Sequence, residues 1–259
     1  FRQLPIYFGM GWPQPEYSHV PLIHGPDGKK LSKRHGATAV DEYRDVLGYL
    51  PEGMKNYLLR LGWSHGDDEI IPETRAIEWF DLDGLNKAPA RLDFAKLDSV
   101  NKHYIAEADD GRLFSLLLQR PEMAGKGDEE MSRVLNAMPA LKTRAANMVQ
   151  LAQQARFLTD IRPIALTGKA ADQVNDEARA HLADLLPRLE GLGEWTEAAI
   201  KAELTQYCDQ KGISLGKIGP VLRAVLTGGA PSPDITLVLA LLGRNEAFAR
   251  VRDYARSGG

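Results

Sequence analysis

Residues 218–254, IGPVLRAVLTGGAPSPDITLVLALLGRNEAFARVRDY, contain three short apolar runs that determine the fold class we expect. The apolar residues recur every three or four positions, a spacing typical of amphipathic helices. Gly228 and Gly243 end the first two runs, and glycine commonly terminates a helix. Asp234 and Asn245 can cap the second and third runs at their N-termini. The stretch therefore predicts three short helices in a compact bundle.

The helical pattern extends upstream over most of the chain. Apolar residues step by three and four without interruption over 138–155, which predicts one long buried helix. The same spacing predicts helices over 174–189 and 200–207. No internal repeat of fixed period is present, which argues against a solenoid of identical units. These patterns together predict a mainly α-helical protein.

Shorter helices and acidic loops are expected between residues 41 and 110. Pro51 suits the first position of a helix that ends at Gly62. Thr74 and Asp93 can cap two further helices. This region is therefore predicted to be a small helical connector ahead of the bundle.

The front of the chain has a different composition. Five prolines and four glycines precede Leu31, so they exclude a long helix and indicate short strands and turns. Residues 19–23 are an expected edge strand, and residues 25–28 are a turn by composition. A loop over 29–36 follows, and it contains four cations: Lys29, Lys30, Lys33 and Arg34.

A mobile, glycine-bounded loop with several cations can close over a polyphosphate. Its lysines can then stabilise the charge that develops on phosphorus in a transition state. Ser32 can donate a hydrogen bond to a phosphate oxygen or hold the backbone of the loop. A solvated basic hairpin explains the same residues, so the charge pattern alone leaves both interpretations open.

The composition of the 259 residues argues against several classes of protein. Hydrophobic residues make up 44% and charged residues 26%, and the longest apolar run, 237–242, is shorter than the ~20 residues of a membrane helix. The single cysteine, Cys208, excludes an internal disulfide and a Cys-rich zinc site, which favours the cytoplasm. A net charge of −3 argues against indiscriminate binding of nucleic acid. We expect no secretory signal and no membrane partner.

Basic residues outnumber acidic ones near the end of the chain. Seven cations and three acids lie between Lys211 and Arg256, a surplus that suits a phosphate backbone. Solvated helix faces explain the same count, so this pattern alone leaves RNA binding open. Aromatic residues that could stack on bases lie at expected core positions, namely Trp195, Tyr207, Phe248 and Tyr254. The histidines lack metal-binding spacing, so we expect no metal site.

The loop sequence Lys30-Leu31-Ser32-Lys33-Arg34, followed by His35-Gly36-Ala37, resembles the KMSKS signature of class I aminoacyl-tRNA synthetases. The wording KLSKRHGA is similar to the form used by bacterial glutamyl-tRNA synthetases. Further segments are similar to the same family, namely 11–13, 19–23, 49–52, 56–64, 101–105 and 220–243. The family's HIGH tetrapeptide is absent, so the resemblance implies a C-terminal fragment.

The resemblance implies a mainly α-helical chain of three parts. Residues 1–40 would be the end of a Rossmann-like class I catalytic domain, with its last strand and the KMSKS loop. Residues 41–110 would form a helical connector that contacts the tRNA stem. Residues 111–259 would form an α-helical, bundle-like anticodon-binding domain.

The resemblance also implies the chemistry of the whole enzyme, a glutamate–tRNA ligase. Glutamate would attack the α-phosphate of ATP, pyrophosphate would leave, and the glutamyl group would pass to the terminal ribose of tRNA(Glu). Mg²⁺ would accompany ATP as a substrate, while the fragment alone would bind no cofactor and would be inactive. We expect the whole enzyme to be a cytoplasmic monomer.

The resemblance assigns the site residues by position. The expected ATP-binding loop consists of Lys30, Leu31, Ser32, Lys33 and Arg34, with Lys33 as the direct phosphate contact and Lys30 as the second catalytic lysine. The expected tRNA contacts are Lys142, Arg144, Lys217, Arg223 and Arg250. Two other functions stay open, a non-catalytic RNA-binding module and a helical interaction scaffold. The lysine loop favours the ligase, because neither alternative needs it.

Overall fold

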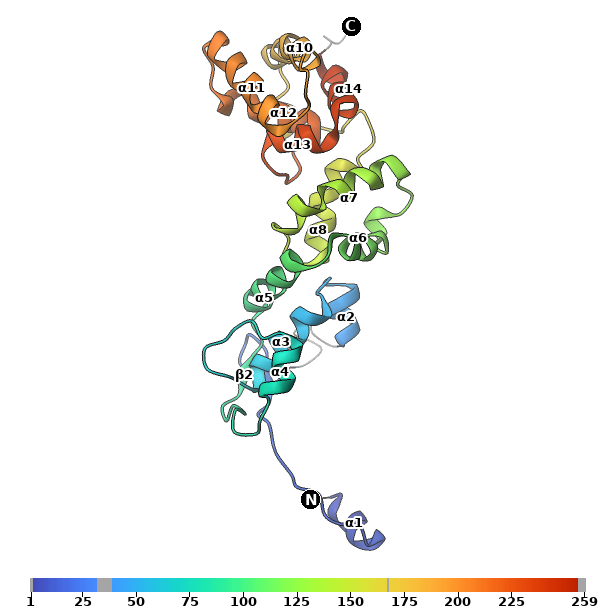
Figure 1. The fold of residues 1–259 in the computed structure, drawn as a ribbon, viewed down its shortest axis with the longest axis vertical. Helices are drawn as coiled ribbons and strands as arrows, with labels where there is room; N and C mark the ends of the chain where they lie inside the picture. Colours follow the sequence, from blue (N-terminus) through green and yellow to red (C-terminus); the bar gives the residue numbers. More distant parts are fainter. Residues whose placement is uncertain (1, 32–38, 167, 256–259) are drawn as a thin grey trace. The chain divides into compact units, whose positions relative to one another are not determined.

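The computed structural model describes residues 2–31, 39–166 and 168–255. Helices form most of the described structure, which confirms the predicted mainly α-helical fold (Figure 1). The chain divides into two compact units. Unit 1 comprises Phe1–Glu42 and Pro51–Val100, and unit 2 comprises Tyr43–Leu50 and Asn101–Gly259. No helix in the described ranges combines the length and apolarity needed to span a membrane.

Unit 1 contains a small parallel sheet and several short helices. Strand β1 (Ile23–His24) pairs with β2 (Ala90–Arg91), and Ile23 lies opposite Ala90. The helices of this unit are α1 (Leu4–Met10), α3 (Pro51–Gly62) and α4 (Glu73–Trp79), while α2 (Val40–Asp45) and α5 (Phe94–Glu107) have residues in both units.

Two expectations for the helices of unit 1 are confirmed and one is wrong. Helix α3 begins at Pro51 and ends at Gly62, as predicted. Asp93 caps α5, because its Oδ1 accepts a hydrogen bond from the backbone N–H of Ala95 at 2.9 Å. Thr74 lies inside α4, which begins one residue earlier, so it is not the cap of that helix.

The first 24 residues contain less strand and more helix than predicted. The edge strand expected over 19–23 is only the two-residue β1, since Pro21 has no N–H with which to extend the pairing. Helix α1 lies where only strands and turns were expected. It tolerates Pro5 because the residue is in the first turn, where a backbone N–H has no helical partner.

Unit 2 is a helical bundle with one continuous hydrophobic core. Its longer helices are α6 (Asp110–Leu118), α7 (Asp128–Lys142), α8 (Met148–Ala155), α10 (Asp176–Glu190), α11 (Glu197–Lys211), α12 (Leu215–Thr227), α13 (Ile235–Leu242) and α14 (Arg244–Ala255). Short segments are η2 (Pro121–Met123), η3 (Arg156–Leu158) and α9 (Lys169–Asp172). The aromatic residues expected in the core all pack against it, namely Trp195, Tyr207, Phe248 and Tyr254.

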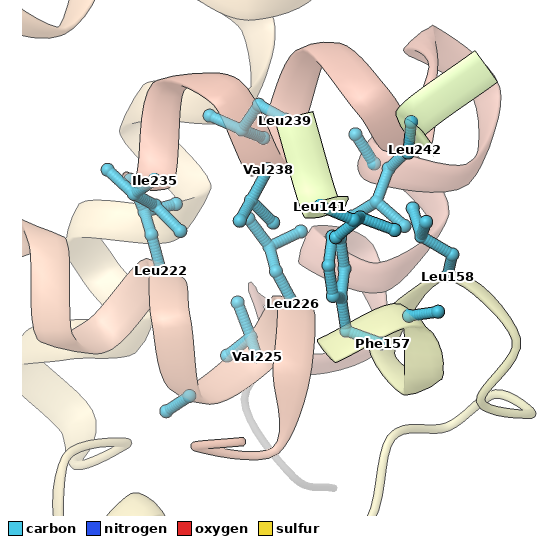
Figure 2. Packing of buried hydrophobic residues seen from close by; sticks show 14 of the residues in the cluster. Leu141, Phe157, Leu158, Leu222, Val225, Leu226, Ile235, Val238, Leu239 and Leu242 are labelled. Carbon is cyan, nitrogen blue, oxygen red and sulfur yellow. The ribbon is translucent and has the colours of Figure 1, made fainter. Parts of the chain in front are cut away.

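The core joins the first helices of unit 2 to the last ones. Figure 2 shows Leu141 of α7 and Phe157 of η3 among apolar side chains of α12 and α13. Leu141, Phe157 and Leu226 each have 0% exposure. Because burying such a side chain contributes about 1.5–3 kcal/mol, these contacts hold the two ends of the unit together.

The long helix predicted over 138–155 is wrong, although its apolar residues are buried as expected. Helix α7 ends before Thr143, and α8 begins after Asn147, whose side chain caps it by accepting from the N–H of Gln150 at 2.9 Å. The carbonyl of Ala146 in the link accepts from Asn101 Nδ2 at 2.6 Å. Polar side chains therefore form hydrogen bonds with backbone groups where the helix is interrupted. The spacing of apolar residues does not indicate this interruption.

The three C-terminal helices predicted from residues 218–254 are confirmed. Helix α12 ends at Gly228, whose φ of 64° lies in the left-handed region that favours glycine, and α13 ends at Gly243. Asp234 occupies the N-cap position of α13 without a side-chain cap hydrogen bond. Helix α14 begins at Arg244, so Asn245 lies in its first turn and is not its cap.

Candidate functional site

A tight turn leads from β1 into the lysine loop. The N–H of Gly25 donates to the carbonyl of Lys29 at 2.8 Å, and Asp27 Oδ1 accepts from the N–H of Lys29 at 3.0 Å. Gly28 has a φ of 76°, and a Cβ there would lie 3.4 Å from the Arg91 guanidinium. Because this φ lies in the left-handed region, glycine is favoured here for its conformation, while a Cβ would only be in ordinary contact with the Arg91 side chain.

The chain returns from this turn antiparallel to β1. Lys30 forms an isolated bridge with His24, and the N–H of Leu31 donates to the carbonyl of Ile23 at 3.0 Å. The turn therefore fixes the backbone of Lys30 while leaving its side chain exposed. The other predicted loop residues, Ser32, Lys33 and Arg34, lie outside the described residues, and the roles of the whole loop stay predictions.

The basic surplus of the C-terminal segment is largely matched in space by helix α10. Three of its cations each pair with a carboxylate of that helix. Lys211 lies 2.6 Å from Asp184 and Lys217 2.6 Å from Glu177, while Arg252 pairs with Glu190. The hydrogen bonds from these two lysines lower the pKa values of Asp184 and Glu177. A charge count along the sequence therefore overstates the positive charge available to RNA.

Lys142 also has acidic and carbonyl partners close by. Its Nζ lies 2.7 Å from Asp110 Oδ1 and donates to the carbonyl of Ala108 at 2.9 Å, and its side chain is 18% exposed. This lysine fastens the end of α7 to the start of α6. The tRNA contacts predicted for Lys142 and Lys217 remain predictions, and these pairings disfavour them.

Arg250 is buried and holds other elements in place, so the tRNA contact predicted for it remains a prediction that its burial disfavours. Its side chain has 0% exposure. Its Nη1 donates to the carbonyls of Phe157 and Leu226 at 2.7 and 2.6 Å, and its Nε pairs with Glu246 at 2.7 Å. Burial lowers the pKa of this guanidinium, while the hydrogen bond to Glu246 acts in the opposite direction. A buried arginine of this kind has no surface to offer a phosphate.

The two remaining predicted cations, Arg144 and Arg223, line the same groove, which we call the cationic groove. It has a volume of about 550 Å³. Its lining consists of Lys102 from α5, Thr143 and Arg144 from the α7–α8 link, Gln154 from α8, Arg223 from α12, and residues 229–232 after α12. Among these described lining residues, three are cations and none is a carboxylate. The groove is therefore a surface on which positive charge is not locally matched.

Arg223 holds one wall of the cationic groove in place. Its Nη1 donates to the carbonyl of Pro233 at 3.0 Å and to the carbonyl of Ser232 at 3.3 Å, and it also contacts Ser232 Oγ. Gly228 and Gly229 both have positive φ, which lets the chain turn sharply from α12 into this wall. The groove thus has a loop wall fastened by one of its own cations.

Gln154 of α8 also lines the groove. Its Nε2 donates to the carbonyl of Arg144 at 2.9 Å, while its Oε1 is buried and has no protein hydrogen-bond partner among the described residues. Sequence reasoning missed Lys102, Gln154 and Ser232 as site residues. Of these three, only Lys102 could have been found from the sequence, because it lies in the segment 101–105 that resembles the family.

A second groove of about 740 Å³ adjoins the cationic groove. The two share Arg223 and residues 229–231 as lining. Arg156, Asp160 and Lys169 supply charged groups to the second groove. The loop after α12 therefore contributes to the lining of both grooves.

Two protein-family models match the chain, one over its first part and one over its helical remainder. Residues 98–255 match the anticodon binding domain family, and residues 2–99 match the catalytic domain of class I tRNA synthetases (E and Q). The cationic groove lies entirely within the first match.

Curated relatives and solved structures point the same way. The chain is 51% identical over 261 residues to glutamate–tRNA ligase 2 of Rhodospirillum centenum, covering 100% of this chain and 56% of that protein. It is 49% identical to glutamate–tRNA ligase 2 of Parvibaculum lavamentivorans, covering 98% and 52%. A solved glutamate tRNA ligase from Elizabethkingia meningosepticum, in complex with its amino acid, matches with a TM-score of 0.78 and 27% identity, covering 98% of this chain and 55% of that one. The chain thus spans about half the length of the relatives it matches.

Proposed function

The chain belongs to the class I glutamyl-tRNA synthetase family, and we propose that it supplies the phosphate-binding loop and the tRNA-binding half of a glutamate–tRNA ligase. In this proposal residues 1–40 end the catalytic domain, residues 41–110 form the connector, and residues 111–259 bind the anticodon region. The substrates are glutamate, ATP with Mg²⁺, and tRNA(Glu). The whole enzyme acts as a cytoplasmic monomer.

The reaction needs no nucleophile from the protein. The glutamate carboxylate attacks the α-phosphorus of ATP, and the bond to the departing pyrophosphate breaks. A ribose hydroxyl of the tRNA then attacks the acyl carbon, loses its proton, and releases AMP. Catalysis therefore depends on alignment of the substrates and on stabilisation of charge at phosphorus.

The lysine loop would provide that stabilisation. We assign the direct phosphate contact to Lys33 and a second contact to Lys30, with Leu31, Ser32 and Arg34 completing the ATP-binding loop. The turn that fixes the backbone of Lys30 and leaves its side chain exposed supports this role. In the full-length enzyme, Lys33→Ala should slow pyrophosphate exchange by at least ~10²-fold, as loss of one preorganised donor does, and leave tRNA affinity nearly unchanged. An unchanged exchange rate would contradict the assignment.

The cationic groove is the main structural support for the proposed tRNA-binding role. Guanidinium groups such as those of Arg144 and Arg223 can donate to phosphates and to acceptor atoms on base edges. Unpaired bases, as in an anticodon loop, expose these edges for recognition. The groove brings together three cations from separate segments, so it suits a phosphate-bearing ligand such as a nucleotide.

Binding of a tRNA(Glu) transcript to the 259-residue chain over a series of salt concentrations tests the proposal. Phosphate contacts predict that log K falls linearly with log salt concentration. The double variant K102Q/R144Q should weaken binding and reduce the slope. Its matched control, K201Q/K217Q, removes two cations outside the groove and should change neither quantity. Salt-independent binding, or equal effects of the two double variants, would contradict the assignment of the groove.

The same titration separates the alternative functions. A helical interaction scaffold should bind no tRNA at any salt concentration. A non-catalytic RNA-binding module is not favoured, because residues 2–99 match a synthetase catalytic domain.

A further inference from the structure

Three cations from distant parts of unit 2 converge on one short stretch of backbone, residues 157–160. Arg250 Nη1 donates to the carbonyl of Phe157 at 2.7 Å, and its Nη2 donates to that of Asp160 at 3.2 Å. Arg133 Nε donates to the carbonyl of Leu158 at 3.3 Å, and Lys126 Nζ donates to that of Thr159 at 3.0 Å. Four successive carbonyls thus each accept from a cationic side chain. We call this arrangement the carbonyl clamp.

The clamp lies where the backbone favours positive charge. Residues 157–160 follow α8 and include the end of η3, where carbonyls lack helical partners and carry partial negative charge. Arg250 is fully buried and Arg133 is 12% exposed, so water screens these contacts little. The clamp is therefore a strong fastening within the unit.

Arg250 connects this stretch to a second element. The nitrogen that donates to Phe157 also donates to the carbonyl of Leu226 in α12 at 2.6 Å. Glu246, one turn earlier on α14, accepts from its Nε and keeps the guanidinium oriented. One side chain thus ties together α14, the end of η3 and the end of α12.

Both elements held by Arg250 continue into the cationic groove. Gln154, three residues before Phe157, lines one wall, and residues 229–232, shortly after Leu226, line the other. We infer that Arg250 is a positioning residue that sets the spacing between the two walls of the cationic groove, and thereby its discrimination between RNA bases. This inference rests on the proposed function, because it assumes that the groove binds tRNA.

A positioning role makes a specific prediction for Arg250→Lys. Lysine keeps a charge beside Glu246 but has one ammonium group in place of a planar fork, so it cannot bridge Phe157 and Leu226 in the same way. The probes are a tRNA(Glu) transcript and the same transcript with one changed anticodon base. We expect the ratio of the two affinities to fall at least about fivefold, the lower end of what one good base contact supplies. The salt slope should stay at its wild-type value, because lysine keeps the positive charge.

The control must separate positioning from loss of stability. Leu204→Ala destabilises the core in α11 without touching the clamp, and Leu204 is likewise fully buried. All titrations are made below the temperature at which any variant begins to unfold, as checked by circular dichroism. Leu204→Ala should leave both the affinity ratio and the salt slope unchanged. An unchanged ratio in Arg250→Lys, or a slope reduced by about 0.9 as for one lost phosphate contact, would overturn the inference.

A second variant and a second measurement complete the test. Lys126→Met removes the donor to Thr159, so it should also lower the affinity ratio, but by less than Arg250→Lys does. This variant tests the inference if Arg250→Lys does not fold. Spin labels at Thr143→Cys and Ala230→Cys, on the two walls, measure their separation without RNA. We expect a broader distance distribution in Arg250→Lys, and an unchanged one would overturn the inference. A wild-type chain that binds neither transcript contradicts the proposed function, and the label distances still decide the role of Arg250.

Discussion

The cations of the groove and those that face α10 have the same charge but different neighbours. Lys211, Lys217 and Arg252 each pair with a carboxylate of α10. Lys102, Arg144 and Arg223 line a groove in which no described lining residue is acidic. Only the second set leaves positive potential for a polyanion to neutralise. RNA-binding capacity therefore follows the arrangement of charge in space, and not its density along the chain.

Among the groove and α10 cations, the largest loss of tRNA affinity is expected for Arg223→Met. This substitution removes a groove cation and also the donor to the carbonyls of Ser232 and Pro233, so the loop wall loses its fastening. We expect tRNA affinity to fall by about 3 kcal/mol, the upper end for one arginine contact, in a filter-binding titration. Arg223→Lys keeps the charge without the planar fork, so it should recover only part of the loss. Full recovery by lysine would show that charge alone matters here.

A much smaller effect on RNA binding is expected for Lys217→Met. Its Nζ lies 2.6 Å from Glu177 and its side chain is 48% exposed, so removal of this cation leaves a carboxylate unpaired but takes nothing from the groove. Affinity for tRNA(Glu) should change less than about twofold, well below the loss from Arg223→Met. Arg144→Met serves as the positive control in the same titration. A loss from Lys217→Met equal to that from Arg144→Met would erase the distinction between the two sets of cations.

The sequence predicts local elements better than the site. Apolar spacing and glycine stops locate α12, α13 and α14, because these signals act within one turn or at one residue. Arg223 and Arg250 look alike in the sequence, yet one lines the groove and the other is fully buried. Whether each arginine is exposed or buried depends on packing between segments up to 93 positions apart, such as Arg250 with Phe157. Local patterns carry no information about such pairings.

The groove itself was beyond prediction for the same reason. Its lining runs from Lys102 to Ser232, and it is assembled from two helix connections and three helices. The KMSKS-like motif identified the family because a contiguous motif needs no tertiary structure to be recognised. The acidic partners on α10 likewise became visible only when α11, α12 and α14 were packed around that helix.

The smallest expected effect concerns the pH dependence of the α10 pairs. The hydrogen bond from Lys211 lowers the pKa of Asp184 below its ordinary value of 3.8. A carboxyl group whose pKa is lowered by folding stabilises the protein above its unfolded pKa, and this contribution is lost as the pH falls through the folded pKa. Asp184→Asn should therefore lower the urea midpoint slightly at pH 6, and the difference from wild type should shrink below about pH 4.

Measurement of the urea midpoint from pH 6 to pH 3 in both proteins tests this expectation, with Glu194→Gln as a control at an exposed site outside the α10 pairs. Binding to tRNA(Glu) at pH 7 should be the same for wild type and Asp184→Asn, because the unpaired Lys211 lies outside the cationic groove. If removal of the carboxylate instead strengthened tRNA binding as much as a groove cation does, Lys211 would belong to the RNA-binding surface. The carboxylates of α10 would then reduce the positive charge of that surface. The α10 cations and the groove cations would differ only in how strongly they bind RNA.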